Sequence, residues 1–283
     1  MKQPDKLSWI TLTACLLTLL SAGVSAASAA NNRGVIIFST APTQTPKATR
    51  KRYQPIADYL SRVLKRRVVL VPAENFIEYS QNIIEDKYDL VFDGPHFAAW
   101  RMKKYNHSLV AKLPGKLRFV VVIREDTHVK NLKRLAGKRV CAVGSPNLLT
   151  LGFIDLFPNP AAVPVIMNSK NFNAAIKCAK QHIGIAAVVR DKFWLKKPPK
   201  VKAGLKLFYT SKVTWPHRVF TTSARIDAQT RQKIAEALLS DKARGPARLV
   251  LKQFKAKRFV RPTEAEYKGL GHLLRAIWGF HEQ

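Results

Sequence analysis

Short runs of consecutive apolar residues alternate with helical patterns along most of this chain. The apolar runs predict strands, and residues recurring every three or four positions predict helices. The predicted strands are 34–38, 68–71, 88–92, 118–123, 139–143, 163–166, 183–189, 206–209 and 220–222. The predicted helices are 53–64, 76–84, 95–105, 149–157, 172–181, 227–239, 244–252 and 267–278. This alternation is typical of mostly parallel sheets covered by helices, so the sequence predicts an α/β fold with a second α/β unit after residue 131.

The first thirty residues have the three-part pattern of a secretory signal. Two lysines precede the apolar run 7–20, and small residues follow it. Because the run is shorter than the roughly twenty residues of a membrane-spanning helix, we expect a signal peptide over residues 1–30, cleaved near Ala26 or Ala30. A lipoprotein signal ending at Cys15 is the alternative.

Charge and composition narrow the class of partner. The 283 residues include 49 Lys and Arg against 18 Asp and Glu, a formal net charge of +31. This excess disfavours a basic partner surface and leaves anionic ligands, anionic lipids and nucleic acid open. Export to the periplasm disfavours nucleic acid, so we expect no specific nucleic-acid partner. The basic side chains either form a solvated face or supply a positive field around the molecule.

Catalytic and metal-binding patterns are missing from the sequence. No nucleophile elbow, His-Glu-x-x-His pair, Walker loop or dinucleotide fingerprint occurs, and no two histidines share one helix face. We therefore expect no enzyme, no catalytic residue, no metal site and no cofactor. After signal cleavage two cysteines remain, Cys141 and Cys178, and either a disulfide or two buried thiols fits their surroundings.

Four segments between residues 35 and 239 resemble a known family. They are 39–42 with the helix that follows it, 88–97 with its Gly-Pro turn, 132–144, and Pro216 after the return strand. In this order and spacing they resemble the periplasmic phosphonate/phosphate/phosphite-type substrate-binding proteins of ABC transporters, which are PhnD-like and have the type II periplasmic binding-protein fold.

The resemblance implies a two-lobed molecule with a ligand cleft between the lobes. Lobe 1 would comprise 31–117 and 210–283, and lobe 2 would comprise 118–209, joined by two crossover strands. Such lobes close on a ligand at the carboxyl ends of their strands. The implied function is capture of a small polar solute, with phosphonate- or phosphate-like oxyanions as one class, by a periplasmic monomer that serves a membrane permease. The alternative is a sensory or scaffold protein of the same fold that engages a membrane partner or an anionic polymer through its basic surface.

Turns at the strand ends would reach this cleft and supply the ligand contacts. The candidate ligand-binding residues are Ser39, Thr40, Asp93, His96, Phe97, Ser145, Asn147, Trp215 and His217. Several of them have a structural alternative. Ser39 and Thr40 either donate to the ligand or cap the next segment, Asn147 either donates or caps a helix, and Asp93 with His96 forms either a pocket edge or a pair that holds the turn.

The loop that grips phosphonate in the family differs in this chain. The family has a Ser-Thr-Ser-Gly-like run, whereas residues 145–150 read Ser-Pro-Asn-Leu-Leu-Thr. Only Ser145 and Thr150 keep a hydroxyl, and Pro146 has no N–H to donate. Asp93 also brings a carboxylate to the first-lobe turn, where it disfavours a dianion unless it is protonated or paired.

Overall fold

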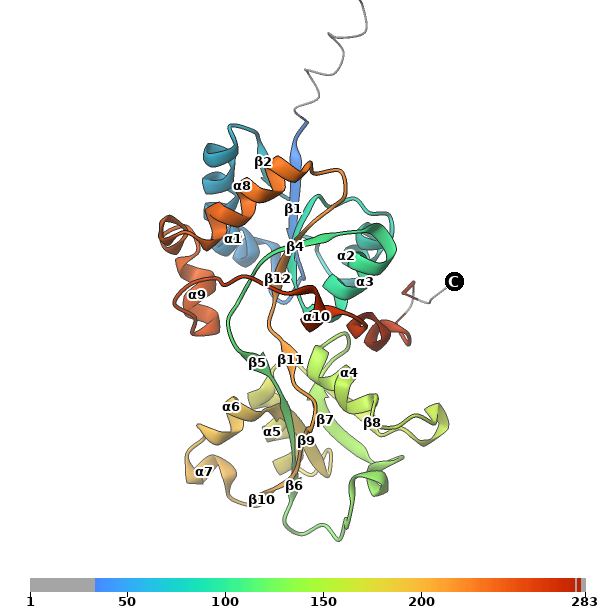
Figure 1. The fold of residues 1–283 in the computed structure, drawn as a ribbon. Coiled ribbons are helices and arrows are strands. Elements are labelled where there is room, and N and C mark those ends of the chain that lie inside the picture. The colour runs from blue at the N-terminus through green and yellow to red at the C-terminus, as the bar shows by residue number, and fades with distance from the viewer. Residues whose placement is uncertain (1–33, 278, 281–283) are drawn as a thin grey trace, which may run out of the picture. The chain divides into compact units, whose positions relative to one another are not determined.

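The computed structural model describes residues 34–277, 279 and 280. The predicted signal peptide and its cleavage sites lie outside these residues. From Ile36 onward the chain builds two five-stranded sheets and a two-stranded ribbon, with helices packed on the sheets (Figure 1). The α/β prediction is therefore confirmed. In the described part of the chain, no helix is both long enough and apolar enough to cross a bilayer.

The first sheet is mixed: β12 alone runs against the other four strands. Its order is β2-β1-β3-β12-β4, and β12 pairs antiparallel with both β3 and β4. The strands are β1 (Ile36–Thr40), β2 (Val68–Leu70), β3 (Leu90–Asp93), β4 (Ser108–Lys112) and β12 (Val219–Thr222). The helices that accompany it are α1 (Pro46–Leu64), α2 (Phe76–Ile84), α3 (Pro95–Tyr105), α8 (Ala228–Leu239) and α9 (Arg248–Phe254).

The second sheet has the order β10-β6-β9-β7-β8. Strands β7, β8 and β9 run parallel, and β6 pairs antiparallel with β9 and β10. The strands are β6 (Phe119–Arg124), β7 (Arg139–Val143), β8 (Val165–Ser169), β9 (Ala186–Arg190) and β10 (Leu205–Thr210). The helices are α4 (Leu148–Ile154), α5 (Phe172–Lys180), α6 (Asp191–Leu195) and α7 (Pro199–Lys202). Two 3-10 turns, η1 (Leu132–Leu135) and η2 (Pro160–Ala162), lie between these strands, and a third, η3 (Asp241–Arg244), lies between α8 and α9.

The chain passes between the two sheets twice. It leaves the first sheet through β5 (Lys116–Leu117) and returns through β11 (Trp215–Pro216), and these strands pair antiparallel. Figure 1 shows this ribbon between the sheets. Both passages lie side by side, so strand ends from the two sheets face the same region.

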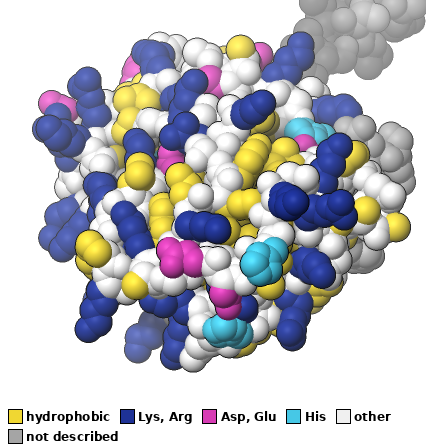
Figure 2. Space-filling model, turned by 90° about the horizontal axis from the view of Figure 1, so that it is seen from below, with side chains coloured by type: hydrophobic (Ala, Val, Ile, Leu, Met, Phe, Trp, Pro, Cys, Tyr) yellow, Lys and Arg dark blue, Asp and Glu magenta, His cyan; other side chains and the backbone are white. Residues whose placement is uncertain are grey.

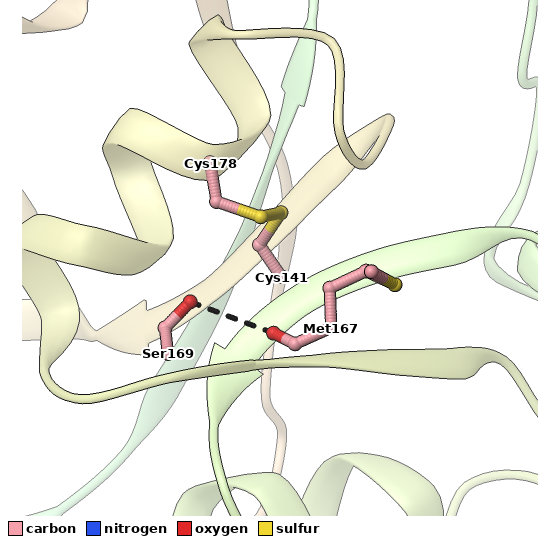
Figure 3. Close-up of a disulfide and its surroundings, with 4 residues drawn as sticks. All are labelled: Cys141, Met167, Ser169 and Cys178. Atoms are coloured by element: carbon pink, nitrogen blue, oxygen red, sulfur yellow. Dashed lines mark hydrogen bonds between the residues drawn. A yellow bond between two sulfur atoms is a disulfide. The ribbon is translucent and has the colours of Figure 1, made fainter.

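A disulfide joins the second sheet to its helix. Cys141 in β7 and Cys178 in α5 are bonded, with their Cα atoms 6.0 Å apart (Figure 3). This resolves the alternative that the sequence left open. The bond thus fastens α5, which begins at Phe172 just after β8, to the inner strand β7 of the second sheet.

The predicted helix over 267–278 is wrong. The chain instead forms the short helix α10 (Glu264–Tyr267) and the 3-10 turn η4 (Leu270–Leu274). Gly269 between them has a φ of 81°, which glycine adopts readily and which ends the helix. Gly271 lies against the backbone of Trp100 in α3, where an added Cβ would come within 3.1 Å of Cα. The apolar periodicity of this segment therefore reflects packing on α3.

Strand β4 was not predicted from the sequence. It follows α3 closely and is the edge strand of the sheet, half-buried at Ser108 and Leu109 and buried from Val110 to Lys112. Basic side chains are distributed over the surface, and on the face shown in Figure 2 they far outnumber the acidic ones. The excess of basic side chains is thus exposed on this face.

Candidate functional site

A pocket of about 460 Å³ lies where strands of both sheets end. From the first sheet it is lined by residues that follow β1 and β3 and precede β12. From the second sheet it is lined by the ends of β7, β8 and β9. Such a position outside the carboxyl ends of parallel strands is where open α/β sheets bind ligands. The pocket is therefore the candidate functional site.

Besides His96 Nδ1, which is an acceptor because Nε2 of that ring donates to Pro146, three buried nitrogen atoms at one end of the pocket have no hydrogen-bond partner among the described residues. They are Nε of Arg190 at the end of β9, Nη1 of Arg218 and Nε2 of His217 in the turn before β12. The Arg218 backbone N–H donates to His217 Nδ1 at 2.8 Å. Since Nδ1 accepts this bond, the neutral imidazole carries its proton on Nε2. All three unpartnered atoms are therefore donors.

Electrostatics at this end favour an anion. Burial lowers the pKa of His217 to about 3, and the neighbouring charges of Arg190, Arg218 and Lys192 act in the same direction. Burial also lowers the pKa of Arg190. Among the described residues that line the pocket none is acidic, whereas Arg190, Arg218 and Lys170 are basic. The pocket can thus surround an anionic group with N–H donors and positive charge.

His96 at the start of α3 bridges the two sheets across the pocket. Its Nε2 donates to the carbonyl oxygen of Pro146 at 3.0 Å, and burial lowers its pKa to about 4. A Cβ at Gly94 would come within 2.6 Å of the imidazole, so this position requires glycine. The bond links the α3 turn of the first sheet to the loop before α4 of the second.

Aromatic rings form much of the remaining wall. Phe76 and Phe97 lie nearly parallel, with ring centroids 6.5 Å apart and an interplanar angle of 11°. Phe172 lines the pocket from the second sheet. Phe254 lies edge-on to His217 at 5.2 Å and beneath the Arg218 guanidinium at 5.5 Å, so it helps to position both donors.

Four of the nine predicted residues line this pocket. They are His96, Phe97, Asn147 and His217. Asn147 Oδ1 accepts from the backbone N–H groups of Leu149 at 3.1 Å and Thr150 at 3.4 Å, so its oxygen caps α4. The cap interpretation of Asn147 therefore accounts for its oxygen atom.

Ser39 and Thr40 lie below the pocket and are not part of its lining. Ser39 Oγ donates to the Val71 carbonyl at 2.7 Å, and Thr40 Oγ1 donates to the Phe92 carbonyl at 2.6 Å. Both side chains are fully buried. Their hydroxyl protons therefore tie β1 to neighbouring strands, and the chain next to them, at Ala41, reaches the pocket instead.

Asp93 is likewise outside the lining, in a buried polar cluster. Arg101 donates to both of its carboxylate oxygens, at 2.7 and 2.9 Å, and the Tyr79 hydroxyl donates at 2.6 Å. Arg101 also donates to Thr221 Oγ1 at 3.0 Å. The expected partner His96 bonds to Pro146 instead. The carboxylate that the sequence analysis expected beside the ligand is thus paired with the Arg101 guanidinium.

Ser145 and Trp215 also lie away from the lining. Ser145 is exposed and faces a smaller cavity beside η4. Trp215 is buried and stacks on Phe119, with centroids 5.9 Å apart and planes 17° apart. Its ring lies so close to Gly152 that an added Cβ would come within 2.5 Å. Trp215 therefore supports the ribbon between the sheets.

The sequence reasoning missed the two arginines. Arg190 directly follows the apolar strand predicted at 183–189, and Arg218 directly follows the candidate His217. A basic residue at the carboxyl end of a buried strand is a usable signal, because that end of the sheet faces the cleft. In a chain with 49 Lys and Arg, this signal did not stand out.

Comparisons with known proteins agree with this geometry. A family model described as "ABC transporter, phosphonate, periplasmic substrate-binding protein" matches residues 38–267. No curated protein sequence matches the chain.

Solved structures share the fold at low sequence identity. The chain is similar to PhnD1 from Prochlorococcus marinus in complex with methylphosphonate, with a TM-score of 0.62 and 20% identity over 86% of this chain and 98% of that one. It is similar to XAC2383 from Xanthomonas citri bound to ATP, with a TM-score of 0.69 and 15% identity over 88% and 99%. It is also similar to PA3383 from Pseudomonas aeruginosa, a binding protein component of an ABC phosphonate transporter, with a TM-score of 0.59 and 15% identity over 82% and 83%. These likenesses confirm the predicted type II periplasmic binding-protein fold.

Proposed function

Because this chain belongs to the family of periplasmic substrate-binding proteins of phosphonate ABC transporters, it captures a solute and is not an enzyme, and we propose that its solute carries a phosphonate- or phosphate-like oxyanion. The oxyanion binds at the end of the pocket formed by Arg190, Arg218 and His217.

One observation carries this proposal: three buried N–H donors lack a partner and no acidic side chain of the described lining opposes them. Leaving a buried donor unpaired costs about 1–3 kcal/mol, more for a charged group. An oxyanion accepts bonds from all three donors and also neutralises the guanidinium charges. A neutral solute can accept such bonds but leaves the guanidinium charges unneutralised, and a cationic solute adds to them, so the donors favour an anion.

The arginines also account for the altered loop at residues 145–150. In this chain Asn147 caps α4, and the Thr150 hydroxyl donates to the Val143 carbonyl at 2.6 Å. That loop therefore has few free donors, and charge-assisted bonds from Arg190 and Arg218 replace a hydroxyl-rich grip. Two solved structures of the same fold hold methylphosphonate and ATP, and both ligands carry negatively charged oxygen atoms on phosphorus.

The remaining contacts come from the predicted residues that reach the pocket. His96, Phe97 and Asn147 contact the solute beside His217, and closure of the two lobes, 31–117 with 210–283 and 118–209, excludes water from it. The protein acts as a periplasmic monomer and delivers the solute to a membrane permease. The family match favours this over the sensory or scaffold alternative.

Calorimetric titration of the purified protein with methylphosphonate, phosphate and phosphite tests the proposal. We expect saturable binding of at least one of them, and Arg190→Gln and Arg218→Gln each to weaken it about tenfold or more. Arg231→Gln is the matched control, because Arg231 is half-buried, has an unpartnered Nε and lies in α8 away from the pocket. Absence of binding by all three oxyanions to folded, solute-free protein would contradict the proposal, as would wild-type affinity in both pocket variants.

A further inference from the structure

The pocket reaches across three strand ends of the second sheet, and its unpartnered N–H donors lie on the β9 side. In the second sheet β7 lies between β9, which ends at Arg190, and the edge strand β8, which ends at Ser169. Neighbouring strands are about 4.8 Å apart, so these two strand ends are separated by about 10 Å. Residues beyond both ends line the same pocket. Its lining therefore has a cationic end and a second end near β8.

The second end is walled by two phenylalanines from different sheets. Phe172 begins α5 just after β8, and Phe76 begins α2 just after β2, the edge strand beside β1. Both rings are half-buried and line the pocket. Each is backed by another ring, Phe172 by Phe193 at 5.4 Å and Phe76 by Phe97 at 6.5 Å. These contacts hold the two rings in place.

The size of the pocket exceeds what a single oxyanion needs. Its volume of about 460 Å³ lies within the range of roughly 300–1,000 Å³ typical of pockets that hold drug-sized organic ligands. A tetrahedral oxyanion at Arg190 and His217 leaves the end near Phe76 and Phe172 unfilled. Aromatic side chains make favourable contacts with a flat ring. A ligand that fills the pocket thus needs an oxyanion for the N–H donors and a flat ring for the aromatic wall.

We propose that the solute is an aromatic oxyanion, in which a flat ring lies at the end walled by Phe76 and Phe172 while the oxyanion binds Arg190, Arg218 and His217. This rests on the proposed oxyanion capture and adds the class of its organic group. Lys170 is an exposed lysine of the lining beside Phe172. A polar or anionic substituent on the outer edge of the ring would therefore meet a positive charge there.

Phenylphosphonate and methylphosphonate separate the two halves of this ligand. We expect phenylphosphonate to bind about tenfold or more tightly than methylphosphonate, by calorimetric titration. Phe172→Ala should reduce this ratio to about twofold, and because the ratio compares two oxyanions in the same variant, a general change in the pocket affects both affinities alike. The matched control is Phe208→Ala, since Phe208 is a half-buried phenylalanine in β10 that does not line the pocket. Circular dichroism and thermal unfolding establish that each variant is folded.

The outcomes distinguish the two proposals. If methylphosphonate or phosphate binds as tightly as phenylphosphonate, or if Phe172→Ala and Phe76→Ala keep the full ratio, the aromatic inference is overturned while oxyanion capture stands. If no oxyanion binds, or if phenol binds as tightly as phenylphosphonate, the oxyanion proposal itself fails. A preference for phenylphosphonate that is lost in Phe172→Ala and kept in Phe208→Ala supports the aromatic oxyanion.

Discussion

Replacing Asp93 by Asn should destabilise the protein strongly without removing its ligand contacts. Asp93 and Arg101 have side-chain exposures of 0% and 1%, and the guanidinium donates to both carboxylate oxygens. The variant leaves a buried guanidinium without its counter-charge, a change that costs about 3–5 kcal/mol. The free energy of unfolding of an ordinary domain is about 5–15 kcal/mol, so this loss is a large fraction of the stability.

Thermal and urea unfolding measure this loss. With a shift of roughly 2–4 °C per kcal/mol for a chain of this size, Asp93→Asn should lower the unfolding midpoint by about 6–20 °C. The control is Asp241→Asn, whose exposed pair with Arg244 contributes about 0–1 kcal/mol. The double variant Asp93→Asn/Arg101→Met should recover part of the loss, because no unpaired buried charge remains.

Two results would refute this reasoning. A cost for Asp93→Asn no greater than that of Asp241→Asn would show that the pair is not buried as described. An unchanged stability together with lost methylphosphonate binding would make Asp93 a ligand contact, as the sequence first suggested.

Three further predictions concern the disulfide, a buried histidine and a tightly packed glycine. Replacing both Cys141 and Cys178 by Ala removes a cross-link between positions 37 residues apart, and should lower the free energy of unfolding by about 3–4 kcal/mol in urea titrations; equal stability of both proteins would argue against the bond. Burial lowers the pKa of His107 to about 4. The folded state therefore resists protonation that the unfolded chain accepts below about pH 6.5, and the stability from this group is lost as the pH falls from 6.5 to 4, by about 1.4 kcal/mol per pH unit. In His107→Gln the pH slope of unfolding should fall by about one proton over this window, and an unchanged slope would contradict it. Gly184→Ala places a Cβ within 2.9 Å of the Arg139 carbonyl oxygen and should cost about 1–3 kcal/mol in thermal unfolding, whereas Gly245→Ala, with open space around it, should cost little; equal effects would show that the close approach is not there.

For helices α2 and α3, the local sequence pattern alone predicts both ends correctly. Helices α2 and α3 span residues 76–84 and 95–105, as their apolar spacing and the Gly94-Pro95 turn indicate. The segment 267–278 has similar spacing but forms no continuous helix. Its glycines serve a positive φ and a close contact with α3, which only the tertiary structure reveals.

The candidate site also contains residues that the local sequence identifies and residues whose role only the tertiary structure reveals. His96 and His217 were found because they lie in turns at strand ends, and topology alone brings such turns to the cleft. Thr40 and Asp93 lie in similar places, yet their polar atoms are used by Phe92 and Arg101. Thr40 and Phe92 are 52 residues apart, so their bond cannot be inferred from one segment. Arg101 is eight residues from Asp93, and it is the burial of both side chains that marks them as a pair.

The arginines illustrate the opposite error. Local pattern offered no way to separate Arg190 from the many basic side chains on the surface, since its distinction is burial without a partner for its Nε atom within the described part of the chain. Only the assembled strand ends give it that property.

A crystal structure with phenylarsonate, an arsenic analogue of an arylphosphonate, tests capture of an oxyanion most directly. The anomalous signal of arsenic locates the oxyanion independently of the surrounding density. We predict one strong peak with its oxygens within hydrogen-bond distance of Arg190, Arg218 and His217. A fully occupied peak elsewhere on the protein, with none beside these residues, would contradict the account.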